Sequence, residues 1–132
     1  MTREFVPYTE AFELKEIGFD EPCFGYYEPN GDFDYIESNI LKNFPYLAKN
    51  SEWKDLCGAP TYSQAYTFFR KHQDWPIDSW VQPYLSEKPK QYESFYWIRG
   101  EKVSVGVFST HDEAELACLR KLIEIVKKRQ ST

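Results

Sequence analysis

The sequence lacks the patterns that mark membrane-spanning and secreted chains. No apolar run approaches the roughly 20 residues needed to cross a bilayer, and the first ten residues lack the basic and then apolar order of a signal peptide. The three cysteines are widely spaced and form no C-x-x-C pair, which favours reduced, buried thiols over disulfides: Cys23, Cys57 and Cys118. We therefore expect a cytoplasmic protein that holds neither a metal nor a cofactor.

Catalytic motifs are missing as well. The chain has no G-x-S-x-G, no glycine-rich phosphate loop, no H-E-x-x-H and no calcium loop. His72 and His111 are its two histidines. On one helix, His111 and Cys118 would lie about 10 Å apart along the axis, too far for a nucleophile and its base. We predict no catalytic residue, and an enzyme whose site is assembled from distant residues stays open as an alternative.

Charge is divided unevenly along the chain, which has 132 residues and a net charge of −5. Residues 1–60 hold 5 basic and 12 acidic residues, whereas residues 61–132 hold 11 basic and 9 acidic ones. This length fits one domain over 1–132. We therefore expect one domain with an acidic half over 1–60 and an α-β-β-β-α half over 61–129.

In the acidic half, the pattern predicts a short helix followed by a hairpin. Thr9 is a candidate cap for this helix, and Gly18 is a candidate end, with Phe19 placed to fold back on the last turn. The turn signal at 29–32 separates two short aromatic segments, 23–27 and 33–36. We interpret 37–59 as a packed connection.

The second half carries the clearer signals. Thr61 and Gln64 fit a capping box for a helix over 61–72, and Thr110 and Glu113 fit another for a helix over 111–128. Strands are predicted over 77–84, 92–98 and 103–108, the last two joined through 99–102. The predicted fold class is α+β, with a mostly antiparallel sheet of about four to five strands, two main helices on one face and a short N-terminal helix.

The hairpin presents two faces. With Gly100 in the first turn position, Ile98 faces Val103 on the predicted core side, and Trp97 faces Ser104 on the other. Large aromatic rings on that other side must be covered or must bind something. The candidate binding residues are therefore aromatic and basic: Trp80, Phe95, Trp97, Arg99 and Lys102.

Two segments resemble parts of known sequences. LKEIGFDEPCFGYY, from Leu14 to Tyr27, and APTYSQAY, from Ala59 to Tyr66, are similar to segments of small, uncharacterised bacterial and prophage-encoded proteins. The resemblance implies a bacterial or mobile-element origin. It carries no activity that could be transferred to this chain.

Three function classes remain open. The favoured one is a non-enzymatic module that binds another protein through the aromatic face or the acidic half. The second is a nucleic-acid-binding domain, because helix, strand, strand, strand, helix is the order of double-stranded-RNA-binding domains. Acidic residues over 110–115 oppose phosphate contacts there, so the aromatic face would instead stack single-stranded bases. The third is a small-molecule enzyme.

Overall fold

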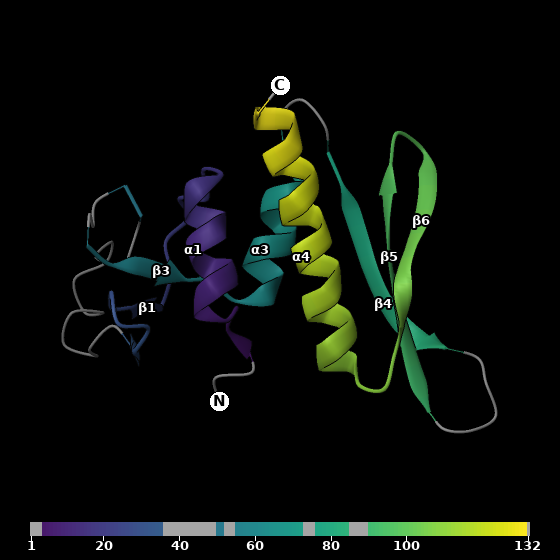
Figure 1. Ribbon diagram of the computed structural model, residues 1–132, viewed down its shortest axis with the longest axis horizontal. Helices are drawn as coiled ribbons and strands as arrows, with labels where there is room; N and C mark the ends of the chain where they lie inside the picture. The colour runs from purple at the N-terminus through teal and green to yellow at the C-terminus, as the bar shows by residue number, and fades with distance from the viewer. Residues whose placement is uncertain (1–3, 36–49, 52–54, 73–75, 85–89, 132) are drawn as a thin grey trace. The chain divides into compact units, whose positions relative to one another are not determined.

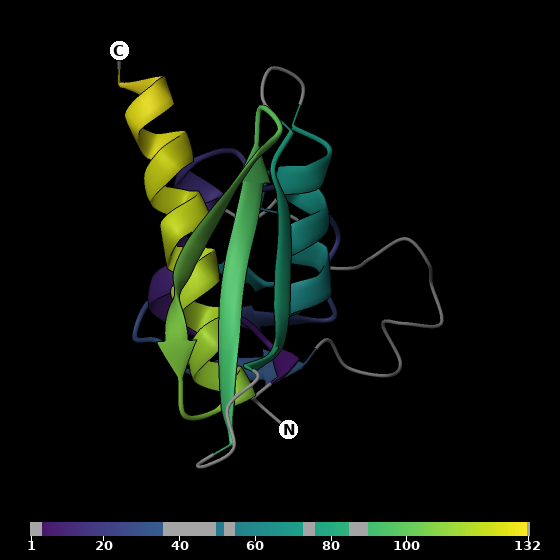
Figure 2. The same ribbon diagram turned by 90° about the vertical axis from the view of Figure 1, so that its right-hand side faces the viewer.

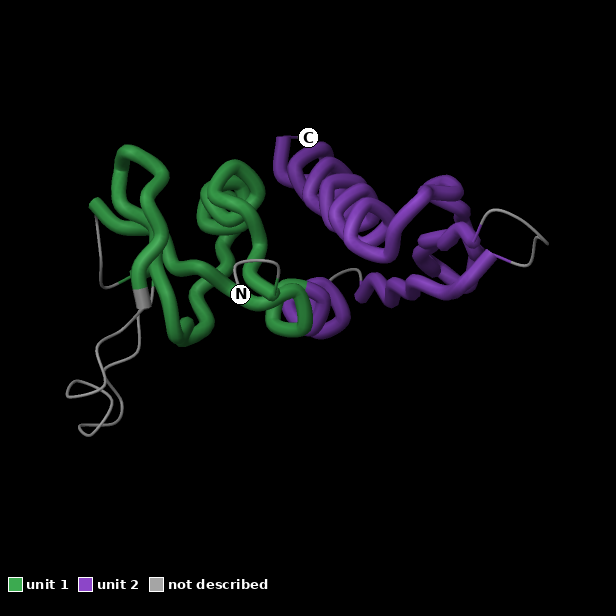
Figure 3. The backbone as a smooth tube through the Cα atoms, turned by 90° about the horizontal axis from the view of Figure 1, so that it is seen from below, with its two compact units in different colours: residues 1–65 green, residues 66–132 purple. Residues whose placement is uncertain are grey.

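The computed structural model describes residues 4–35, 50–51, 55–72, 76–84 and 90–131. Contacts divide the chain into two compact units, unit 1 over Met1–Ala65 and unit 2 over Tyr66–Thr132 (Figure 3). The boundary falls inside helix α3, Tyr62–Arg70. The single domain over 1–132 stays a prediction.

Unit 1 begins with helix α1, Tyr8–Glu16. The helix starts one residue before Thr9, and its N-cap is Pro7, which makes no side-chain capping bond, so the predicted Thr9 cap is wrong. The predicted end is confirmed. The Gly18 N–H donates to the Lys15 carbonyl and the Phe19 N–H to the Leu14 carbonyl, the two bonds of a Schellman motif, with Gly18 at φ +107°.

A three-stranded antiparallel sheet completes the described part of unit 1. Its strands are β1 (Gly25–Tyr27), β2 (Phe33–Tyr35) and β3 (Cys57–Ala59), in the order β2-β1-β3. The predicted hairpin is β1 and β2, joined by a turn in which Gly31 has φ +92° and the Asn30 side chain accepts from the Asp32 N–H. Most of the segment predicted as a packed connection, 37–59, lies outside the described residues, but its end forms β3.

Unit 2 holds a second antiparallel sheet and a long helix. The strands are β4 (Asp78–Tyr84), β5 (Gln91–Ile98) and β6 (Glu101–Phe108), in the order β4-β5-β6, and the helix is α4, His111–Gln130. Helix α4 lies along one face of this sheet (Figures 1 and 2). The α+β class is confirmed, and the elements from residue 62 on follow one another as α3, β4, β5, β6 and α4.

The prediction of one sheet with four to five strands is wrong. The described residues form two sheets of three strands each, six strands in total. Hydrophobic alternation marks each strand locally, but it does not say which strands share hydrogen bonds across the chain. The described residues contain no helix that is both long and apolar enough to cross a membrane.

Of the two predicted helix starts in the second half, α3 has both bonds of a capping box, and α4 has the bond to the N-cap side chain. At α3 the Gln64 N–H donates to Thr61 Oγ1 over 3.2 Å, and the Thr61 N–H donates to Gln64 Oε1 over 3.0 Å. At α4 the Glu113 N–H donates to Thr110 Oγ1 over 3.1 Å. These bonds satisfy N–H groups that a helix cannot pair within its first turn.

The β5–β6 register differs from the prediction. A two-residue turn, Arg99-Gly100, joins the strands with both residues at positive φ, +54° and +80°, so Tyr96 rather than Ile98 pairs with Val103. Trp97 pairs with Lys102 instead of Ser104. This shift of two residues preserves the predicted faces near the turn, because side chains alternate with a period of two.

Candidate binding surface

One face of the β4-β5-β6 sheet gathers aromatic and polar side chains. Cross-strand partners point to the same side of a sheet, and so do alternate residues along a strand. Trp80 pairs with Phe95, Phe95 also pairs with Ser104, and Trp97 pairs with Lys102. These five residues therefore share one side, which we call the aromatic face: Trp80, Phe95, Trp97, Lys102 and Ser104.

Helix α4 covers the opposite side. Tyr92, Ser94 and Tyr96 alternate with the aromatic face along β5, and Ser94 and Tyr96 are buried. The Tyr92 ring contacts the ring of His111, the first residue of α4, with centroids 5.7 Å apart. Near the turn, the predicted core side of the hairpin is thus the side that packs against the helix. Beyond the bulge, Val107 pairs with Glu93 rather than with Ser94 as predicted, and therefore lies on the other side.

The rings of the aromatic face form one connected cluster. The Phe95 and Trp97 centroids lie 5.0 Å apart, and those of Trp97 and Trp80 lie 6.4 Å apart, both edge to face. Lys102 Nζ lies 4.2 Å from the Phe95 centroid, a cation–π distance, so the ammonium lies over the Phe95 ring, and Phe95 is only 2% exposed. Trp80 is 56% exposed. The cluster is therefore closed at Phe95 and open at Trp80.

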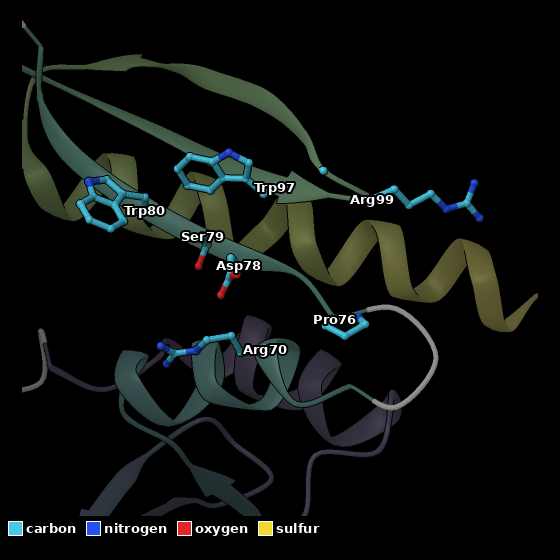
Figure 4. Close-up of a pocket in the computed structure, with 8 residues that line it drawn as sticks. Arg70, Pro76, Asp78, Ser79, Trp80, Trp97 and Arg99 are labelled. Atoms are coloured by element: carbon cyan, nitrogen blue, oxygen red, sulfur yellow. The ribbon is translucent and has the colours of Figure 1, made fainter.

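A cleft of about 610 Å³ borders this cluster. Figure 4 shows β4 above the end of α3, with Asp78 pointing toward the helix that carries Arg70, and with the Arg99 side chain extending beyond the end of β5. The lining comes from α3, from β4 and from the β5–β6 turn: Arg70, Pro76, Asp78, Ser79, Trp80, Trp97, Arg99 and Gly100. All of these residues belong to unit 2.

Three of the five residues proposed from the sequence line this cleft: Trp80, Trp97 and Arg99. Phe95 and Lys102 belong to the aromatic face but do not line the cleft. Sequence analysis missed Arg70 and Asp78. A basic residue in the last turn of a helix already has an explanation in the helix dipole, and no sequence pattern connects Arg70 with Asp78 at the start of β4. Trp75, an aromatic residue near the same segment, lies outside the described residues.

The start of α4 brings together three groups that could bind a metal. The ligand atoms of His111, Asp112 and Glu115 lie within 4.8 Å of one another. Burial raises the pKa of the Glu115 carboxyl, His111 opposes this rise, and Asp112 adds to it. The partial positive charge of a helix N-terminus opposes a cation at this position. We assign no metal site to these residues.

The three thiols are buried and free. Burial raises the pKa of Cys118 to about 12, although Tyr66 and the Trp80 backbone lower it. Burial likewise raises the pKa of Cys23 to about 12 and that of Cys57 to about 11. A thiol that keeps its proton at neutral pH is a poor nucleophile. The thiols therefore act as apolar core groups.

Unit 1 has a smaller cleft of about 230 Å³, which Cys57 and Lys15 help to line. The Lys15 Nζ donates to the Leu56 carbonyl over 2.9 Å, so this ammonium is tied to the wall of the cleft. Among the described residues, neither this cleft nor the larger one is lined by a histidine. His72, the other candidate base, has a buried Nδ1 with no hydrogen-bond partner within the described part of the chain.

Comparison with known proteins gives no relative for this chain: no family model, no curated protein and no solved structure matches it.

Proposed function

We propose that the chain is a protein-interaction module and that unit 2 binds its partner through the aromatic face and the adjoining cleft. The observation that carries this proposal is Trp80, whose indole is 56% exposed while it contacts a second indole, Trp97. Exposed aromatic clusters of this kind are enriched at protein interfaces, where burial of tryptophan contributes much of the binding energy.

The charge on this surface favours a protein over a nucleic acid. Arg70 and Arg99 line the cleft together with one carboxylate, Asp78. On the aromatic face, Lys102 is accompanied by Glu93, which accepts a hydrogen bond from Ser104 over 2.8 Å. Tight binding to nucleic acid rests on many phosphate contacts. Three cations offset by two carboxylates supply few such contacts, so affinity here would come mainly from burial of the indoles.

The enzyme alternative has less support. An enzyme would need a cleft in which His72 or His111 lies beside a thiol or a carboxylate. Neither the 610 Å³ cleft nor the 230 Å³ cleft has a histidine among its described lining residues. His111 does lie beside two carboxylates, but it is exposed at the start of α4. A general base needs a position beside bound substrate.

The proposal is tested with matched aromatic variants in a bacterial lysate. Tagged wild-type protein, Trp80→Ala and Phe24→Ala are used for capture, followed by high-salt washing and mass spectrometry. Phe24 is the control, because it is 49% exposed and belongs to unit 1, whereas the aromatic face belongs to unit 2. We expect a protein that Phe24→Ala retains and Trp80→Ala loses. Nucleic acid released by salt, or a partner that both variants capture equally, would contradict the proposal.

A further inference from the structure

The smaller cleft, in unit 1, is lined by three aromatic residues. Helix α1 contributes Tyr8 and Phe12, and strand β1 contributes Tyr27 from its last position. Tyr8 and Phe12 are four residues apart, which places them on the same side of the helix. Helix α1 also contacts strand β3, whose first residue, Cys57, lines the cleft as well. The cleft is therefore lined from one helix and from two strands of the same unit.

Successive rings in this cleft are inclined to each other. The Tyr8 and Phe12 centroids lie 6.2 Å apart with their planes at 50°, and the Tyr8 and Tyr27 centroids lie 5.4 Å apart with their planes at 60°. Tyr27 is 7% exposed and donates its hydroxyl hydrogen to the Val6 carbonyl over 2.5 Å, whereas Phe12 is 44% exposed. The rings thus run from a buried, anchored one to an exposed one, and their faces point in different directions.

Two carboxylates line the same cleft. Glu28 follows β1 and Asp55 precedes β3, and both residues are exposed. The cation in the described lining is Lys15, whose Nζ donates to the Leu56 carbonyl over 2.9 Å. Carboxylates outnumber cations here even when Lys15 is counted in full. Residues 1–60 hold 12 acidic and 5 basic residues, so the field of the unit also attracts cations.

Rings and carboxylates together favour one kind of ligand. The face of an aromatic ring carries partial negative charge and attracts a cation that lies within about 6 Å of its centroid. A methylated ammonium suits this lining better than a primary ammonium, because it gives up fewer hydrogen bonds to water when it leaves solvent. The cleft volume of about 230 Å³ is below the roughly 300 Å³ at which sites for drug-sized molecules begin, so it fits a small head group.

We propose that the cleft of unit 1 binds a methylated ammonium group, carried either by a small molecule such as choline or by a trimethylated lysine side chain. The cation lies against the three rings, and the Glu28 and Asp55 carboxylates balance its charge. This site goes beyond the proposed function, because it belongs to unit 1, whereas the aromatic face and its adjoining cleft belong to unit 2.

The test is an NMR titration of the full chain, followed through the backbone amide signals of Phe12 and Tyr27. The probes are choline, its uncharged isostere dimethylbutanol, in which a carbon atom replaces the nitrogen, ethanolamine, which lacks the methyl groups, and a short peptide with one trimethylated lysine. We expect choline to shift both signals and to bind at least about tenfold more tightly than the isostere or ethanolamine. The peptide identifies the source: tighter binding than choline indicates a modified protein, and weaker binding indicates a small molecule.

Matched variants of two exposed phenylalanines test the site itself. Phe12→Leu keeps an apolar side chain but removes the ring, so it should weaken choline binding at least about threefold. Phe24→Leu is the control, because Phe24 is 49% exposed in the same unit and is not among the described lining residues. Asp55→Asn should weaken binding about twofold at low salt and less at high salt. Trp80→Ala should bind choline as the wild type does.

The outcomes separate this inference from the proposed function. Equal binding of choline and its isostere would overturn the inference, because apolar contact alone would then account for the affinity. Equal binding of choline and ethanolamine, an unchanged affinity in Phe12→Leu, a loss of binding in Phe24→Leu, or no shift with choline or the peptide would overturn it too. None of these results bears on a partner in lysate that depends on Trp80, since that partner would bind unit 2.

Discussion

The β5–β6 turn offers a sharp test of the structure, because its central residues both have positive φ. Gly100 has φ +80°, and a Cβ added there would have no heavy atom within 4 Å. Gly100→Ala therefore affects stability only through the conformational energy of the backbone. A left-handed conformation costs an L-residue about 1 to 2 kcal/mol, and the lower entropy of unfolded alanine offsets about 0.4 to 1 kcal/mol of this cost. We expect the free energy of unfolding of unit 2 to fall by about 1 kcal/mol.

The assay is urea unfolding followed through the NMR signal of the Trp97 indole, which reports on unit 2. With a slope of about 2 kcal/mol per molar urea, the loss moves the unfolding midpoint down by about 0.5 M at constant slope. Glu101→Ala is the control, because this exposed neighbour lies in a strand with extended backbone. An unchanged midpoint for Gly100→Ala would refute the assignment of the two-residue turn.

A substitution of Arg99, the other residue of the turn, is expected to raise stability instead of lowering it. It has φ +54°, which asparagine tolerates better than arginine does. Arg99→Asn should therefore raise the midpoint, by up to about 0.5 M if it recovers about 1 kcal/mol. A longer connection between the strands, with Arg99 outside the left-handed region, would leave the midpoint unchanged or lower it.

Three further predictions concern helix α4 and the thiols. Thr110→Ala removes the acceptor of the Glu113 N–H and should cost about 1 kcal/mol in the same titration. Leu122→Ala truncates a fully buried side chain and should cost about 2 to 5 kcal/mol, whereas Val107→Ala, at a position 39% exposed, should cost far less. At pH 8 a thiol-specific disulfide reagent should modify no cysteine until urea unfolds the chain, since Cys118 and the two other buried thiols have raised pKa values. The native state holds these protons more tightly than the unfolded chain, so the associated stability is present below pH 9.0 and is lost as the pH rises toward about 12.

Helix boundaries were the most predictable part of the fold, because their causes lie within a few residues of each other. The capping box of Thr61 and Gln64, and the Gly18 end of α1, each need one short segment to act. The wrong prediction of a Thr9 cap has a local reason too. Pro7 fits the position before α1 for two reasons. Its φ of −59° is fixed by the ring, and an amide hydrogen, which proline lacks, is not needed at the start of a helix.

The candidate site was predicted in its residue types but not in its extent. Aromatic residues at alternating positions of the hairpin indicated the face that contains Phe95 and Trp97. Arg70 lies in a helix that starts before the sheet, and no sequence pattern tied it to Asp78 at the start of β4. Only the return of the chain after α3 brings the two to one cleft.

The sequence by itself determined many of the elements of this protein: the caps of α3 and α4, the end of α1, the positions of the described strands other than β3, and the α+β class, all of which depend on residues close together in the chain. The tertiary structure decided which strands pair, and it placed the six strands of the described residues in two sheets where the sequence predicts one. It also decided that Phe95 is buried while Trp80 is exposed. The physical reason is the same in each case, because strand pairing and burial depend on residues far apart in sequence, and a period of two along one strand does not specify its neighbours.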